Sequence, residues 1–176
     1  MTQETTTVPP ITALMEVLNF TSDDLKANQQ GNLSPSQADR LKRNRLRTTF
    51  IGVAAFFVIV VIATIFLYFG QVNQSTILSI IGALLTVINA IMIGMIARAH
   101  LRTNADLREG GVEVLEGEVE RVVRRGQQQD NYLLRIDGVS LYVTKDIFIQ
   151  FRHETAYRIY RSRWSGVILS AEPLSD

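Results

Sequence analysis

The stretch TTFIGVAAFFVIVVIATIFLYFGQVNQSTILSIIGALLTVINAIMIGMIA, residues 48–97, contains no Asp, Glu, Lys or Arg. Charged residues make up 20% of the 176-residue chain, and all 35 of them lie outside these fifty positions. A water-soluble domain rarely leaves so long a stretch uncharged, because its helices and strands need a solvent-exposed polar face. The stretch therefore indicates a membrane-embedded part of the chain.

Two candidate transmembrane helices fit within this stretch, at residues 49–70 and 75–97. The first has 22 residues and would be about 33 Å long, enough to cross a hydrocarbon core of about 30 Å. Only QVNQ separates the two, so we expect an antiparallel helical hairpin. Neither span contains an ionisable residue, which disfavours a proton relay, an ion-coupled transporter or a charged pore.

The distribution of Lys and Arg predicts the orientation of this hairpin. Positive residues stay on the cytoplasmic side, and the loop between the spans has none. We therefore expect a multi-pass protein of the cell (inner or plasma) membrane with both termini in the cytoplasm. The cluster before the first span should also lie at anionic lipid headgroups, at about 1 kcal/mol per residue. The cluster consists of Arg40, Lys42, Arg43, Arg45 and Arg47, and Arg98, Arg102 and Arg108 follow the second span.

Small residues recur every four positions in the second span, at Gly82, Thr86, Ala90 and Gly94. We expect them to share one helix face that allows close approach of another helix, either the first span or a second copy of the protein. Asn89 lies beside them near mid-membrane, where its amide needs a partner. It either packs within the hairpin or an oligomer, or lines a pathway.

The N-terminal part predicts a disordered tail at residues 1–10 and short cytoplasmic helices over residues 11–48. Thr21 or Ser22 is suited to cap one of these helices. The sequence from Ser34 to Gln37 resembles a capping box, with proline at the first helical position. The sequence leaves open whether the first apolar-faced helix lies on the membrane or docks on the C-terminal domain.

The C-terminal part predicts a helical linker over residues 98–110, ended by glycines, and a small β domain over residues 111–174. The dipeptide Asp137-Gly138 between apolar runs indicates a tight hairpin, and Gly117 a bulge or bend. Residues 146–151 fit a strand or a short helix. Five or six short strands need protected edges, so we expect an OB- or SH3-like barrel. The fold class is thus an α+β membrane protein: a two-helix transmembrane hairpin followed by a small all-β barrel.

Basic and aromatic residues near the C-terminus form a possible surface for a protein partner or lipid. Twelve acids balance twelve Lys and Arg after residue 97, which makes nucleic acid an unexpected partner. The chain has no cysteine, its two histidines are far apart, and no catalytic constellation or phosphate-binding loop is visible. We therefore expect no enzymatic activity, no metal and no cofactor. The surface consists of Arg152, Arg158, Tyr160, Arg161, Arg163 and Trp164.

The order of elements over residues 49–174, a membrane hairpin followed by a small β-barrel, resembles that of bacterial NfeD-like membrane proteins. Those proteins pair membrane helices with an OB-type domain. The resemblance lies in the architecture and not in a residue motif. It implies a partner of membrane scaffold proteins.

The function expected from these patterns is that of a non-enzymatic membrane adaptor or scaffold protein. Its hairpin would anchor the chain and associate with a second copy or a partner membrane protein, while its cytoplasmic parts present binding surfaces. Two alternatives remain: an accessory subunit of a channel or transporter, and a lipid- or nucleotide-sensing membrane protein.

Overall fold

The computed structural model describes residues 11–126 and 130–174. The predicted disordered tail, residues 1–10, and the middle of the predicted polar turn, residues 127–129, lie outside this range. The chain forms two compact units. One is a helical unit, Asp39–Arg108, and the other is a sheet unit made of Met1–Ala38 together with Glu109–Asp176.

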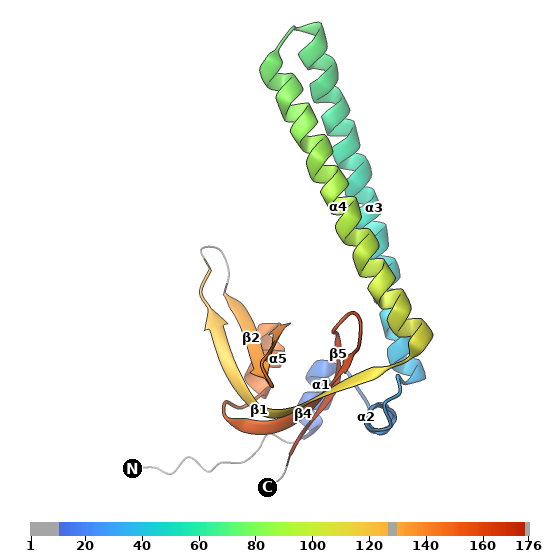
Figure 1. Cartoon of the computed structure of the whole chain (residues 1–176), viewed down its shortest axis with the longest axis vertical. Coiled ribbons are helices and arrows are strands. Elements are labelled where there is room, and N and C mark those ends of the chain that lie inside the picture. Colours follow the sequence, from blue (N-terminus) through green and yellow to red (C-terminus); the bar gives the residue numbers. More distant parts are fainter. Residues whose placement is uncertain (1–10, 127–129, 175–176) are drawn as a thin grey trace. The chain divides into compact units, whose positions relative to one another are not determined.

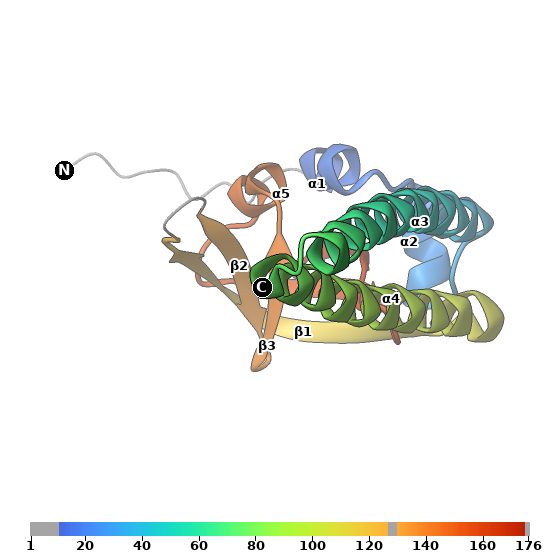
Figure 2. The same ribbon diagram turned by 90° about the horizontal axis from the view of Figure 1, so that it is seen from above.

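The helical unit is an antiparallel pair formed by α3 (Pro35–Val72) and α4 (Thr76–Glu109), which lie side by side in Figures 1 and 2. As predicted, α3 runs without a break from its capping box into the apolar stretch, and Gly110, at φ +64°, ends α4. The loop QVNQ was predicted too long. α3 continues through Val72, and the chain reverses at Asn73 and Gln74, the latter at φ 53°.

Both helices are long and apolar enough to cross a membrane, by length and composition. Their most apolar windows have a mean hydropathy of 3.0 and 2.4, yet only 6% and 11% of the window residues are buried within the protein. Core helices of soluble proteins place most of such residues against other elements. Here most apolar side chains of the pair remain exposed among the described residues.

The sheet unit contains five antiparallel strands in the order β3-β2-β1-β4-β5. β1 is long and curved, and it changes partner along its length: residues 112–119 pair with β4 and residues 120–124 with β2 (Figure 1). β3 and β5 are the two end strands in this order, so the predicted closed barrel is not confirmed. The strands are β1 (Val112–Arg124), β2 (Asn131–Ile136), β3 (Val139–Val143), β4 (Thr155–Ser162) and β5 (Ile168–Pro173).

The predicted hairpin turn is confirmed. Asp137 (φ 48°) and Gly138 (φ 72°) both have positive φ and connect β2 to β3, as a tight primed turn requires. The ambiguous segment after β3 is a helix, α5 (Lys145–Gln150), capped by the Thr144 side chain. Gly117 is not the site of a bulge, because it pairs in register with Tyr157; the register shift instead lies between Tyr160 and Arg161.

The N-terminal helices α1 (Ile11–Leu18) and α2 (Ser22–Gln29) belong to the sheet unit. α1 packs against β5 and α5, and its apolar face joins the main core through Leu14 and Leu18. The choice that the sequence left open is therefore settled in favour of docking on the sheet. The core is completed by residues such as Val119, Ile136, Phe151, Tyr157, Ile159 and Ala171.

The sheet unit is discontinuous in sequence because α3 and α4 are inserted between α2 and β1. The segment that leads into α3 and the segment that follows α4 are joined by backbone hydrogen bonds. The Leu33 N–H donates to the Gly110 carbonyl at 3.0 Å, and the Val112 N–H donates to the Gly31 carbonyl at 3.2 Å. The start of α3 and the end of α4 are thereby tied together within the sheet unit.

Candidate membrane and interaction surfaces

The seam between α3 and α4 has the spacing of a coiled coil. The buried or half-buried residues of both helices recur at alternating intervals of three and four. Such a 3.5-residue repeat keeps the same faces in contact along an antiparallel pair. The seam residues of α4 are Leu78, Gly82, Leu85, Asn89, Met92 and Ile96, and those of α3 include Gly52, Phe56, Ile59, Ala63 and Gly70.

Three glycines allow the helices to approach closely at this seam. A Cβ atom added to Gly82 would lie 2.6 Å from Cγ and 3.0 Å from the backbone nitrogen of Leu67. At Gly70 it would lie 2.8 Å from the backbone nitrogen of Ser79, and at Gly52 it would lie 2.6 Å from Cδ1 of Ile96. At Gly70 and Gly82 the close atoms include backbone of the other helix, so these two glycines are steric requirements of the pair. At Gly52 the close atom is the tip of the Ile96 side chain, which can rotate away.

The predicted small-residue ladder does not form one face toward α3. Gly82 and Asn89 lie in the seam, but Thr86, Ala90 and Gly94 are exposed, and a Cβ on Gly94 would meet nothing within 4 Å. Each step of four residues turns about 40° past a full helical turn, so residues spaced strictly by four move progressively away from a straight seam. The three exposed residues form a second strip of α4, which we call the small strip.

Asn89 is 5% exposed, and its Oδ1 has no hydrogen-bond partner among the described residues. The Thr86 hydroxyl, by contrast, donates to the Gly82 carbonyl within the same helix at 3.0 Å. An unsatisfied amide oxygen in an apolar setting costs free energy. Asn89 is therefore a seam residue whose amide oxygen is not satisfied within the described hairpin.

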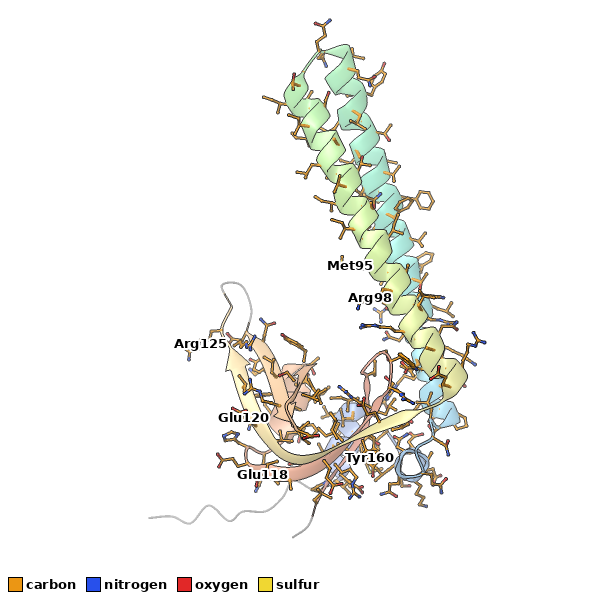
Figure 3. The ribbon with its side chains drawn as sticks, viewed as in Figure 1. Met95, Arg98, Glu118, Glu120, Arg125 and Tyr160 are labelled. Carbon is orange, nitrogen blue, oxygen red and sulfur yellow. The ribbon has the colours of Figure 1, made fainter. Side chains whose placement is uncertain are left out.

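The two basic clusters flanking the apolar stretch lie at the same level of the helical pair. Arg45 Nη1 donates to Asn104 Oδ1 at 3.2 Å, which together with the Gly52–Ile96 contact fixes the register there. Figure 3 shows Arg98 on α4 just beyond the exposed Met95, where the apolar surface ends. We call the combined set the cationic belt. It comprises Arg40, Lys42, Arg43, Arg45, Arg47, Arg98, Arg102 and Arg108.

The charge of the chain is divided between its two units. The helical unit has eight Lys and Arg against two acids, a formal charge of +6. The sheet unit has the other ten Lys and Arg against fifteen acids, a formal charge of −5. The sequence-based balance of twelve against twelve missed this, because it assigned the α4 arginines to the β domain and left out the acidic N-terminal helices, which fold with the sheet.

The predicted basic and aromatic surface is largely neutralised. Arg158 Nε lies 2.8 Å from Glu116 Oε2, and Nη1 of the same residue lies 3.5 Å from Glu172 Oε1. Arg161 pairs with Glu113 at 2.8 Å. The hydrogen bond to Glu116 raises the pKa of Arg158 above its ordinary value. Two of the predicted surface arginines are therefore members of cross-strand ion pairs.

Tyr160 is not a surface residue, contrary to the prediction. It is 2% exposed, and its hydroxyl donates to Glu172 Oε1 at 2.7 Å. Burial, reinforced by the hydrogen bond to Glu172, raises the pKa of Tyr160 to about 12. Tyr160 follows the core residue Ile159 on β4, and Gln29 of α2 also donates to Glu172 of the neighbouring strand β5 at 2.9 Å.

The other members of this predicted surface lie on two separate loops. Trp164 is half-exposed, its indole N–H donates to Glu109 Oε2 at 2.7 Å, and the Arg163 guanidinium lies 6.0 Å from its ring centroid. Arg152 follows α5, and its backbone N–H donates to the Tyr157 hydroxyl at 3.1 Å. Across the described residues, no group of three His, Asp or Glu side chains is arranged to bind a metal ion.

A buried polar cluster fixes the start of α3 to the sheet, and sequence reasoning recognised only part of it. The predicted capping box is confirmed: the Gln37 N–H donates to Ser34 Oγ at 3.2 Å, and the Ser34 N–H donates to Gln37 Oε1 at 3.3 Å. Gln37 Nε2 also reaches the Leu169 carbonyl of β5 at 3.2 Å. This bond links two residues that are 132 positions apart.

Asn28 completes the cluster from α2. It exchanges hydrogen bonds with Gln37 at 2.8 and 2.9 Å and accepts one from the Ser170 hydroxyl at 2.6 Å. Asn28, Gln37 and Ser170 are all at least 99% buried. Buried polar groups are stable only when they are satisfied, so this network specifies one arrangement of α2, β5 and the first turn of α3.

Asp24 is the charged member of the cluster. Its carboxylate accepts hydrogen bonds from the hydroxyls of Ser34 and Ser36 and from the Thr21 N–H at 2.9 Å. Burial opposes ionisation, but these hydrogen bonds outweigh it and hold the pKa of Asp24 below its ordinary value of 3.8. The sequence showed Asp24 only as an acid in the first turn of a helix.

No family model matches this chain, and no significant match was found among curated proteins or among solved structures. The resemblance to NfeD-like proteins therefore gains no support from these comparisons. Inferences about function rest on the surfaces described above.

Substitution of Gly82 by valine should loosen the helical pair. The new side chain would overlap Leu67, including its backbone, and overpacking of this kind costs about 1–3 kcal/mol. Hydrogen exchange of the α3 and α4 amides, measured by mass spectrometry in detergent micelles, should become faster. Ala54→Val is the control and should leave exchange unchanged, because Ala54 is exposed on α3 outside both the seam and the small strip. Equal effects of the two variants would contradict the seam.

Protonation of Asp24 should destabilise the sheet unit. Because the pKa of Asp24 is lowered in the folded state, its contribution is complete above about 3.8 and is lost as the pH falls toward the folded value. Asp24→Asn should therefore lower the free energy of unfolding at neutral pH and flatten its decline in acid. Urea unfolding followed by the fluorescence of the single tryptophan, Trp164, measures both quantities.

Asp23→Asn is the control for this prediction, since Asp23 is in the same helical turn and its side chain is 89% exposed. It should keep the pH dependence of the unmodified chain. If Asp24→Asn and Asp23→Asn have the same stability and the same acid profile, the role assigned to Asp24 is wrong.

Proposed function

We propose that this protein is an integral membrane adaptor, in which the α3–α4 hairpin spans a lipid bilayer and the sheet unit presents binding surfaces on the cytoplasmic side. The observation that supports this most directly is the exposure of the apolar helices. Side chains such as Phe50, Phe57 and Ile77 are 77%, 60% and 73% exposed. Soluble monomers rarely expose contiguous apolar patches above a few hundred Å², whereas a bilayer covers such a surface completely.

The orientation within the bilayer follows from the cationic belt. All eight of its Lys and Arg lie at one end of the helical unit, and the connection Asn73–Ser75 at the other end is uncharged. Positive residues near the ends of spans remain cytoplasmic. Both ends of the helical pair, and the sheet unit that joins them, are then on the cytoplasmic side of a cell membrane.

The small strip of α4 supports self-association. Thr86, Ala90 and Gly94 face away from the seam with α3, and small residues on an exposed helix face allow a second helix to pack backbone to backbone. A second copy of the hairpin is the occupant we propose. The protein would thus act as a non-enzymatic scaffold built from at least two hairpins.

The sheet unit supplies a surface suited to a protein partner. Its five strands form one antiparallel sheet around a single core. α1 and α2 pack on the end strand β5, but none of the described helices packs comparably on β3 at the opposite end of the strand order. β3 has no charged residue, and Tyr142 within it is 70% exposed. Such an edge accepts an added strand from a partner.

Disulfide crosslinking in native membranes tests the scaffold function. The chain has no cysteine, so single cysteines give unambiguous products. Ala90→Cys should form a covalent dimer under mild oxidation. Ile88→Cys, at the same depth on another exposed face of α4, should remain monomeric. A chain that stays monomeric with either cysteine would contradict self-association through the small strip.

A further inference from the structure

We propose that the cationic belt binds the headgroups of anionic phospholipids, and that the sheet unit does not share this binding. The proposal rests on the membrane insertion proposed above and adds the lipid class that the inserted protein selects. It concerns residues of the helical unit alone. The belt brings together two segments, residues 40–47 and 98–108, that are separated in sequence by the whole apolar stretch.

The position of the belt identifies the ligand as a bilayer lipid. The uncharged stretch ends at residue 48 on α3 and at residue 97 on α4, and the nearest cations are Arg47 and Arg98. A bilayer that covers the apolar surface therefore has its headgroup phosphates at the level of the belt. Arginine and lysine donate charge-assisted hydrogen bonds to phosphate oxygens, and arginine can do so with two donors at once.

The belt has few internal acids to neutralise it. Only Asp39 and Asp106 belong to the helical unit, against eight Lys and Arg, so six positive charges remain in excess even if both acids are paired. Lys42 lies 3.9 Å from Asp39, but both side chains are more than half exposed, so this pair is weak. Arg45 Nη1 donates to Asn104, which is a neutral side chain and leaves the charge of Arg45 in place. The arginines of the sheet strands β2 and β4 are, in contrast, matched by Glu113, Glu116 and Glu120.

Because the two units have opposite charges, an anionic membrane surface should bind one unit and not the other. An anionic membrane surface attracts the helical unit, at +6, and repels the sheet unit, at −5. Anionic lipid would then hold the base of the hairpin without recruiting the faces of the sheet, which stay available to a protein partner. A chain with its net charge of +1 evenly spread would show neither effect.

Lipid retention by the full-length protein tests the proposal. The protein is reconstituted in bilayers containing equal amounts of phosphatidylglycerol and phosphatidylcholine, and then extracted in mild detergent. Native mass spectrometry gives the ratio of the two lipids that remain bound. The unmodified chain should retain phosphatidylglycerol preferentially. The triple variant Arg43→Gln, Arg47→Gln, Arg102→Gln should lose most of this preference, at about fivefold per removed charge at low salt.

A matched triple variant in the sheet unit, Arg124→Gln, Arg125→Gln, Arg163→Gln, removes the same charge and should keep the preference of the unmodified chain. The proposal is overturned if the belt variant keeps the preference, or if the sheet variant loses as much. Extraction of the unmodified chain from native membranes by alkaline carbonate would instead contradict membrane insertion itself. Retention in carbonate with equal binding of both lipids overturns only the lipid selection.

Discussion

Most of the apolar surface of α3 and α4 is not covered by the described residues, and this constraint organises the rest of the molecule. Two helices can cover only one narrow strip of each other, which here is the 3.5-residue seam with its glycines at Gly52, Gly70 and Gly82. In the proposed membrane arrangement, lipid or further helices cover the remaining faces. The absence of charge over residues 48–97, and its abrupt return on both helices at the belt, follow from the same requirement.

The sheet unit is built around the insertion of this hairpin. Antiparallel helices return the chain to the point where it left, so one folded unit can receive its first helices from one side of the insertion and its strands from the other. The buried polar cluster joins residues from both sides of the hairpin. Asn28 and Gln37 precede the hairpin, and Ser170 and the Leu169 carbonyl follow it, yet they form one hydrogen-bonded network. The first turn of α3 is thereby specified by the sheet unit.

Local patterns predicted much of this structure, and tertiary pairing determined the remainder. The capping box at Ser34, the turn at Asp137-Gly138 and the end of α4 at Gly110 depend on neighbouring residues and were predicted correctly. The burial of Tyr160 and the ion pairs of Arg158 and Arg161 depend on which strands lie beside β4, and composition does not reveal that. The small-residue ladder was predicted from spacing alone, but the seam follows 3.5 residues and not four. The opposite charges of the two units were not predicted, because the acidic helices α1 and α2 precede the hairpin in sequence but fold with the sheet unit.

Single-cysteine accessibility in intact cells tests the central claim most directly, because the chain has no cysteine of its own. A membrane-impermeant maleimide should label Asn73→Cys, at the connection between α3 and α4, from outside the cell. It should label Glu118→Cys, exposed on β1, only after the membrane is permeabilised. Labelling of Glu118→Cys in intact cells, or protection of Asn73→Cys until permeabilisation, would contradict a hairpin that crosses the membrane with its basic end inside.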